Sequence, residues 1–322
     1  MSLFTGLPGL LAGILVSLAP PQPSQTPDAG ARERVLERAA EELQAGRRAE
    51  AKALLASAAD RFTSVRALMQ LARLQSGDGD AAGALATLSR ARALAPNTEE
   101  VLSAIAQVAM AARAPMQAIV ALEPLTRLAP RVAQHHYMLG VALMQAGDMP
   151  AAVEALQQAD RLQPAHNLTS IALGIALNSR KMFDDARPVL LSVLEREPDN
   201  VEALAALAEA EEGLGELDAA SIHAARALAA APGHPTANLV VGMVLMKRDR
   251  YSDARDALER AAAADAESPK VYYQLSLAFA RLGDDEGATR NRQLYQEKLR
   301  AMEARIIELR GAGLSPRAER RR

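Results

Sequence analysis

The residues whose chemistry could support catalysis or metal binding are few and widely spaced. The sequence has five His and no Cys, which excludes disulfides, thiolate zinc sites and Cys nucleophiles. His135 and His136 are adjacent, and adjacent residues point to different faces of a helix, so the two cannot hold one metal ion by themselves. His223 and His234 fall in a predicted helix and in the turn that follows it, without a triad motif. We therefore expect no metal site and no catalytic residues.

Motifs for phosphate and cofactor binding are also missing from the sequence. It contains no G-x-x-x-x-G-K-[ST], no G-x-S-x-G and no H-E-x-x-H. We interpret Gly77-Asp78-Gly79 as a turn between two helices rather than as part of a dinucleotide-binding loop. Asn167-Leu168-Thr169 has the form of a glycosylation sequon, but its predicted position in a helix makes it incidental. The sequence predicts no cofactor and no enzyme activity.

The composition and charge of the chain favour a helical protein that does not bind nucleic acid. Hydrophobic residues make up 49% of the 322 positions, aromatic residues only 3%, and Trp is absent. A core built from Ala and Leu suits helices that pack closely together. The formal net charge is −2, and the predicted helices carry no basic stripes, so we expect no nucleic-acid partner.

Residues 1–19 carry no charged side chain and are predicted to be a signal peptide or a membrane anchor. The uncharged run is short for a membrane span, and Ser17-Leu18-Ala19 is typical of a processing site, which favours a cleaved signal. No Lys or Arg precedes the run, so a cytoplasmic tail stays an alternative. Residues 20–31 are rich in Pro and predict an extended linker. We expect a periplasmic or secreted protein, with a membrane-anchored or cytoplasmic one as the alternative.

From residue 32 onward the hydrophobic pattern is helical and repeats every 34 residues. This period is carried by Pro96, Pro130, Pro164, Pro198 and Pro232, and by Ala84, Ala118, Ala152, Ala186, Ala220, Ala254 and Ala288. In the unit that starts at Ala133, Gly147 is predicted to end one helix and Asp148 to cap the next. Each unit is therefore predicted to be a pair of helices, which can bury its apolar face only by stacking on neighbouring pairs.

These units resemble the tetratricopeptide repeat. The family pattern has a small residue at place 8, Ala at place 20, an apolar residue at place 24 and Pro at place 32, which Gly140, Ala152, Leu156 and Pro164 match. We predict repeats that start near residues 32, 65, 99, 133, 167, 201, 235 and 269, so that the solenoid covers residues 32–302. The resemblance implies an all-α fold, a right-handed superhelix of about eight helix-turn-helix repeats, in a bacterial and exported protein.

Two departures from the family pattern carry structural predictions. No repeat has the family's Trp at place 4, where Leu68, Leu102, His136 and Leu204 stand instead, so we expect looser packing at this place without a change of fold. The last helix, from about Asp285, turns polar and is predicted to run to about Arg310 as a cap on the final hydrophobic face, or to pair with another subunit. The residues that could line its covered side are Leu294, Met302, Ile306, Ile307 and Leu309. Residues 303–322 hold its end and a basic tail, interpreted as solvated or as a contact for an anionic membrane or an acidic partner.

The resemblance implies that the first helix of each repeat lines a concave groove. The candidate partner-binding residues of this groove are Tyr137, Met144, Leu168, Ile171, Ile175, Asn178, Glu209, Glu212, Leu239, Met243, Met246, Tyr273 and Leu277. Most of them are aliphatic, Met or Tyr, which is typical of surfaces that bind peptides or helices, although packing against neighbouring helices is the alternative.

We therefore expect a non-catalytic scaffold that binds a peptide or a helix of a partner protein in this groove. The alternative function is that of an accessory or assembly subunit of an envelope secretion, pilus or polysaccharide machine. The sequence specifies neither the partner nor the oligomeric state.

Overall fold

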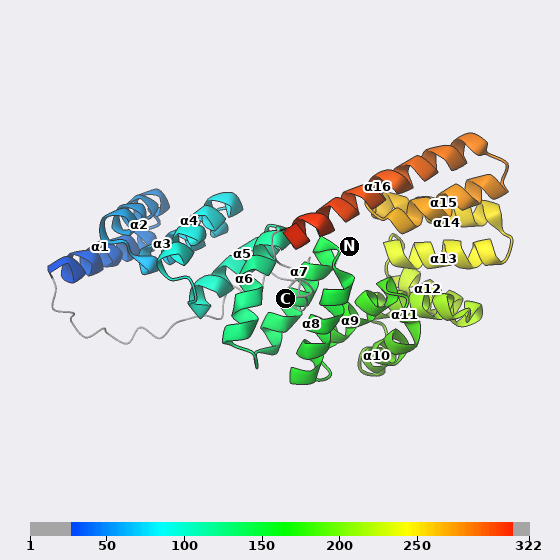
Figure 1. The fold of residues 1–322 in the computed structure, drawn as a ribbon, viewed down its shortest axis with the longest axis horizontal. Coiled ribbons are helices and arrows are strands. Elements are labelled where there is room, and N and C mark those ends of the chain that lie inside the picture. Colours follow the sequence, from blue (N-terminus) through cyan, green and yellow to red (C-terminus); the bar gives the residue numbers. More distant parts are fainter. Residues whose placement is uncertain (1–26, 312–322) are drawn as a thin grey trace. The chain divides into compact units, whose positions relative to one another are not determined.

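The structure, a computed structural model, describes residues 27–311, and there the chain forms sixteen helices and no strands (Figure 1). The helices are α1 (Pro27–Gln44), α2 (Arg48–Phe62), α3 (Val65–Gly77), α4 (Ala81–Leu94), α5 (Glu99–Ala111), α6 (Pro115–Leu128), α7 (Ala133–Ala146), α8 (Met149–Leu162), α9 (Asn167–Ser179), α10 (Phe183–Arg196), α11 (Val201–Leu214), α12 (Leu217–Ala230), α13 (Pro235–Lys247), α14 (Tyr251–Ala264), α15 (Pro269–Arg281) and α16 (Asp285–Gly311). None of these helices is long and apolar enough to cross a membrane. The predicted signal or anchor and the basic tail end lie outside the described residues.

The helices form two compact units, each a stack of helix pairs. Unit 1 extends to Arg113 and holds α1–α5, whereas unit 2 begins at Ala114 and holds α6–α16. In unit 1, α1 packs on α2 and α3 packs on α4. In unit 2 the same pairing joins α7 to α8, α9 to α10, α11 to α12, α13 to α14 and α15 to α16. The predicted all-α fold of helical hairpins is confirmed.

The first helices of seven repeats begin at the residues with which the sequence repeats begin. These helices are α3, α5, α7, α9, α11, α13 and α15. The turn after α7 shows why the boundaries recur: Gly147 adopts a left-handed conformation with φ of 87°, which ends the helix at little cost because glycine has no Cβ. The side chain of Asp148 then accepts a hydrogen bond of 3.2 Å from the backbone N–H of Ala151 and caps α8.

The boundary at the N-terminal end of the described residues differs from the sequence prediction, whereas the last helix runs on as predicted. The extended linker predicted for residues 20–31 is wrong over its last residues, because α1 begins at Pro27. Proline is tolerated in the first turn of a helix, where its missing N–H would have no intrahelical partner, and a small-residue run follows it. At the other end, α16 is one continuous helix through residue 302, so no structural boundary separates the last repeat from the predicted cap.

In unit 2 the helices are arranged in an inner and an outer layer. The first helices of successive repeats, α7, α9, α11, α13 and α15, each contact the next one, whereas the second helices α8, α10, α12 and α14 make at most marginal contacts with one another. Helices that approach one another this way lie on the inside of a curved stack. The first helices therefore form the inner layer of unit 2.

The two helices of a repeat approach closely through a small residue at place 8. A Cβ added to Gly140 would lie 2.5 Å from Cγ of Leu156, and one added to Gly242 would lie 2.5 Å from Cγ of Leu258. Leu156 and Leu258 are themselves fully buried. Real Cβ atoms do not approach other atoms this closely, so the spacing of the helix pair depends on glycine at these places.

We predict that Gly140→Ala lowers the stability of the folded chain. Alanine raises helix propensity by about 1 kcal/mol over glycine, but here the added methyl group would force Leu156 out of place, at a cost of about 1–3 kcal/mol. The matched control is Gly30→Ala in α1, where the nearest atom to the new Cβ is the Arg34 guanidinium at 3.5 Å. Thermal melting followed by circular dichroism should show a lower midpoint for Gly140→Ala and an unchanged or higher one for Gly30→Ala.

Candidate functional site

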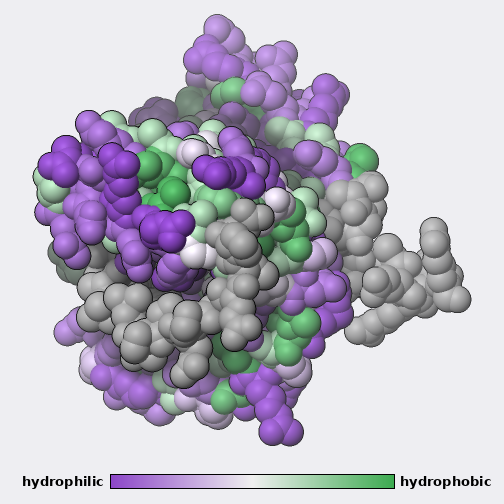
Figure 2. All heavy atoms as spheres, turned by 90° about the vertical axis from the view of Figure 1, so that its left-hand side faces the viewer, coloured by the Kyte–Doolittle hydropathy of each residue, from purple (hydrophilic) through white to green (hydrophobic). Residues whose placement is uncertain are grey.

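Exposed apolar side chains occur in both layers of unit 2, on the outer helices as Leu191 and Ile222 and on the inner helices α9 and α15. Leu168 on α9 is 50% exposed, and Tyr273 and Leu277 on α15 are 45% and 37% exposed. In unit 1 the large hydrophobic side chains that are exposed are Leu43 and Leu94, each on a different helix. Figure 2 views the molecule from the end at which α1 lies, and its coloured surface is mainly hydrophilic, with hydrophobic side chains in small separate patches.

The candidate groove residues differ widely in accessibility. Three of them, Leu168, Tyr273 and Leu277, are exposed. The half-buried ones are Tyr137, Met144, Ile175, Glu209 and Met246, and the buried ones are Ile171, Asn178, Glu212, Leu239 and Met243. In this conformation the buried group belongs to the packing between inner helices, and a bound partner could touch only the other two groups.

Ile171 and Met243 show how the inner helices close over predicted groove positions. Ile171 of α9 packs in one cluster with Val193 and Ala203, which belong to the next two helices. Met243 of α13 packs in another cluster together with Leu275 of α15. The close approach of neighbouring repeats thus turns part of the predicted concave surface into core.

The carboxylates of the inner layer are paired with cations from later repeats. Lys270 Nζ of α15 lies 2.6 Å from Glu209 Oε1 of α11, two repeats earlier in the chain. Lys247 Nζ of α13 lies 2.7 Å from Glu212 Oε1 and donates a second hydrogen bond of 2.9 Å to the Glu212 carbonyl oxygen. These pairs neutralise the charges that interrupt the apolar groove positions, so the accessible part of the inner face is dominated by apolar side chains.

Two further His–Glu contacts, one between α11 and α12 and one between α11 and the N-cap of α13, were not suggested by the sequence. His223 Nδ1 of α12 lies 2.7 Å from Glu211 Oε2 of α11, and His234 Nε2 lies 3.1 Å from Glu202 Oε2. Burial raises the pKa of the Glu211 carboxyl above its usual value, and the hydrogen bond with His223 partly opposes this shift. No sequence motif could have indicated these pairs, because their partners are twelve and thirty-two residues apart.

The His223–Glu211 pair borders a small hollow but has no nucleophile beside it. The hollow holds about 310 Å³ and is lined by Leu191, Leu194, Glu195, Pro198, His223 and Arg226. A histidine with a carboxylate behind it can act as a general base only if a reacting hydroxyl or thiol lies within reach. The lining residues include no Ser, Thr or Cys, so this arrangement has the geometry of a structural pair.

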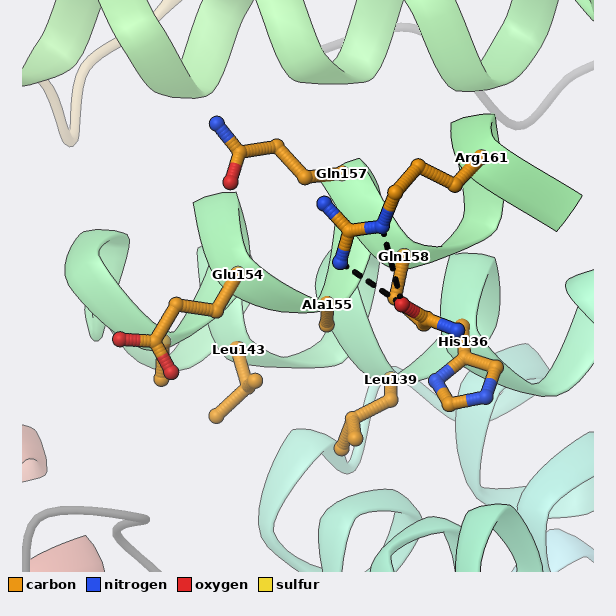
Figure 3. A pocket seen from close by; sticks show the side chains of 9 residues that line it. His136, Leu139, Leu143, Glu154, Ala155, Gln157, Gln158 and Arg161 are labelled. Carbon is orange, nitrogen blue, oxygen red and sulfur yellow. Dashed lines mark hydrogen bonds between the residues drawn. The ribbon is translucent and has the colours of Figure 1, made fainter. Parts of the chain in front are cut away.

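A second hollow of unit 2 lies between α7 and α8, where His136 stands at the place of the family's Trp (Figure 3). It holds about 510 Å³ and is lined by His136, Leu139, Leu143, Ala151, Glu154, Ala155, Gln157, Gln158 and Arg161. His136 Nε2 lies 3.0 Å from the Pro130 carbonyl oxygen, and Arg161 donates two hydrogen bonds to Gln158, of 3.1 and 2.7 Å. Open space therefore lies next to His136, but Leu68, Leu102 and Leu204 at place 4 of other repeats are fully buried, so the expectation of looser packing is wrong for those repeats.

The other polar groups of the inner layer are also explained by packing. Asn178 Nδ2 donates a hydrogen bond of 2.7 Å to the Ala206 carbonyl oxygen and so joins α9 to α11. The ring of Tyr137 packs edge-on against His166, with 6.1 Å between the centroids, and burial raises the pKa of the Tyr137 hydroxyl. Within residues 27–311, no group of three or more His, Asp or Glu side chains is placed to hold a metal ion.

We predict that Lys247→Met destabilises the chain, because it leaves the buried carboxylate of Glu212 without its cation. The side chain of Glu212 is only 5% exposed, and an uncompensated charge at such a place should cost about 1–3 kcal/mol. Arg290→Met is the control, since Arg290 and its partner Glu286 are both well exposed and such pairs contribute less than about 1 kcal/mol. Equal melting temperatures for the two variants would contradict the assignment of Glu212 to a buried pair.

Comparison with known proteins identifies the repeats. The tetratricopeptide repeat model matches residues 103–167, 174–235 and 242–289. A solved tetratricopeptide repeat protein from Parabacteroides merdae ATCC 43184 aligns with 78% of this chain and 99% of its own, at 13% identity and a TM-score of 0.56. YrrB, described as a TPR protein with an unusual peptide-binding site, aligns with 57% of this chain and 95% of its own, at 20% identity and a TM-score of 0.50.

A third solved structure has a similar fold. A chain of the APC/C hetero-tetramer Cut9–Hcn1 aligns with 74% of this chain and 48% of its own, at 17% identity and a TM-score of 0.51. At such identities the likeness to solved structures shows the fold alone, and no curated protein sequence matches the chain. The family model, in contrast, matches more than half of the residues, at the repeats described above. The chain therefore belongs to the tetratricopeptide repeat family.

Proposed function

We propose that the chain is a non-catalytic scaffold and that the inner face of unit 2 binds a peptide or a helix of a partner protein. Tetratricopeptide repeat proteins generally mediate protein–protein interactions. The observation that carries the more specific proposal is the set of exposed apolar side chains on inner helices, Leu168, Tyr273 and Leu277. Large apolar side chains left accessible on a regular helical surface are typical of sites that accept apolar side chains of another polypeptide.

The charge arrangement supports an apolar mode of recognition. Glu209 and Glu212 are already paired with Lys270 and Lys247, so a partner that relied on either sign of charge there would have to break an existing pair. Met144 and Met246 are half-buried and lie near the C-terminal ends of the inner helices α7 and α13. Methionine side chains adapt to different apolar partners, which suits a surface that accepts a peptide rather than a rigid domain.

The proposal is tested by selecting binders from a random 16-residue peptide library displayed on phage, with the full chain as bait. We predict that selected peptides lose at least about tenfold in affinity on Leu168→Asp or Leu277→Asp, since a charge on the apolar surface must be desolvated. Affinity is measured by fluorescence anisotropy with the synthetic peptides, and both residues are exposed, so melting temperatures should change little.

Ile222→Asp provides the matched control for this experiment. Ile222 is 60% exposed but lies on the outer helix α12, so the same change in charge should leave peptide affinity unchanged. Peptides whose affinity falls with Ile222→Asp and not with the inner-face variants would place the binding surface elsewhere. A library from which no peptide is enriched would argue against peptide binding and for assembly through larger surfaces.

A further inference from the structure

The C-terminal helix α16 is twice as long as its position in the last repeat requires. The outer helices α8, α10, α12 and α14 each have 14 residues, whereas α16 has 27. Its first half packs on α15 as the second helix of the last repeat. The distal half, from Leu299 onward, continues beyond the repeat and needs another explanation.

The distal half of α16 reaches back to the fourth repeat. It contacts α7, and the contact is formed by two apolar side chains at the turn that ends α7. A Cβ on Gly147 would lie 3.4 Å from Cγ1 of Ile306 and 3.5 Å from Cγ of Met302. Since both α7 and α15 belong to the inner layer, α16 connects the two ends of that layer, and Figure 1 shows it running from beside α15 toward α7.

One face of α16 carries this contact. Tyr295, Leu299, Met302 and Ile306 follow a spacing of i, i+4, i+7 and i+11, which places them on one side of a helix, and all four are half-buried. Tyr295 packs against the inner-face residue Tyr273, with 5.5 Å between ring centroids. Ile307 is 68% exposed, so the expectation that it lines the covered side of this helix is wrong.

The contact between α16 and α7 involves few side chains. Met302 and Ile306 stay partly exposed in it, and the neighbouring Glu303, Arg305 and Glu308 are exposed to solvent. A helix with a polar back and a short apolar stripe is held by few contacts and can detach without disturbing the core. The unit that remains would then present the end of α7 without a cover.

We propose that the distal half of α16 is a strap that covers the C-terminal end of the inner helix α7 and that partners displace it from there. The inference rests on the proposed function of the inner face, to which α7 belongs. It specifies the partner as an amphipathic helix with large apolar residues at i, i+3 and i+7, because that is the pattern of the half-buried Leu299, Met302 and Ile306 in the segment already docked there. Affinity for such a helix is reduced by the fraction of molecules in which the strap is closed.

The strap is tested first by locking it. The chain has no Cys, so Gly147→Cys combined with Ile306→Cys introduces one pair of thiols at a distance that a disulfide can bridge after a small adjustment. Oxidation should give a crosslinked monomer. Gly215→Cys with Ile306→Cys is the control: Gly215 ends α11 in the same left-handed conformation, with φ of 84° against 87°, but an added Cβ has no neighbour within 4 Å there. Failure of the first pair to crosslink, crosslinking only between molecules, or equal crosslinking of the control pair would overturn the proposal.

Binding is measured with a fluorescein-labelled synthetic peptide of residues 291–309 as the amphipathic helix. Met302→Asp with Ile306→Asp releases the strap from α7, and we expect this variant to bind the peptide at least about tenfold more tightly than the unchanged chain does. Ile307→Asp, on the exposed side of the same helix, should leave the affinity unchanged. The oxidised Gly147→Cys, Ile306→Cys protein should bind more weakly than the same protein after reduction. Equal affinities in either comparison would overturn the strap.

These outcomes separate the strap from the proposed function. Crosslinking and binding of the chain's own segment can succeed even if no library peptide depends on Leu168 or Leu277, in which case the strap is an intramolecular device without an external competitor of that kind. Conversely, library peptides could bind the inner face with the same affinity in the crosslinked and the reduced chain. That result would support peptide binding by this face and overturn the strap.

Discussion

The close approach of two helices over a glycine is the constraint on which the rest of this structure depends. At Gly140, Gly174 and Gly242 the facing leucine would collide with any Cβ, at 2.5–2.6 Å. In the other repeats place 8 holds Ala72, Ala106, Ala208 or Ser276, so a small residue recurs there every 34 residues, the two helices of each hairpin can approach closely, and each hairpin can stack on the next. The curvature that brings the inner helices of unit 2 together is the sum of these offsets.

That curvature decides which side chains remain available for binding. Successive inner helices come close enough to bury Ile171, Leu239 and Met243, and close enough for Lys270 to reach Glu209 two repeats away. An apolar residue on the inner side of a repeat therefore has two possible roles, in the core between repeats or at the surface. Leu168 and Leu277 belong to the second group, which is why the binding proposal rests on them.

The C-terminal helix shows how a terminal repeat can serve two purposes. A solenoid must cover its last hydrophobic face, and the first half of α16 does so against α15. Continuing the same helix by about four turns costs little in backbone order, since helix propagation is cheap once a helix is nucleated. The extension carries Met302 and Ile306 to the turn that ends α7.

The sequence by itself determined the repeat, its period and the places where helices begin and end. These features are local, because Gly147, Asp148 and Pro164 act on the backbone within a few residues of themselves, and the 34-residue period makes the same local signals recur. The start of α1 at Pro27 was not predicted from the sequence. A proline-rich segment is typical of a linker, but proline is also tolerated in the first turn of a helix.

Only the tertiary structure decided which predicted groove residues are accessible, which charges are paired and where the distal half of α16 packs. The sequence shows that Ile171 and Leu168 lie on the inner helix of one repeat, but burial depends on how far neighbouring repeats rotate, a quantity summed over many contacts. The pairing of Glu209 with Lys270 depends on the same rotation between repeats. So does the contact of Ile306, rather than Ile307, with the end of α7. Contacts between residues 61 or more positions apart are set by geometry that no local pattern encodes.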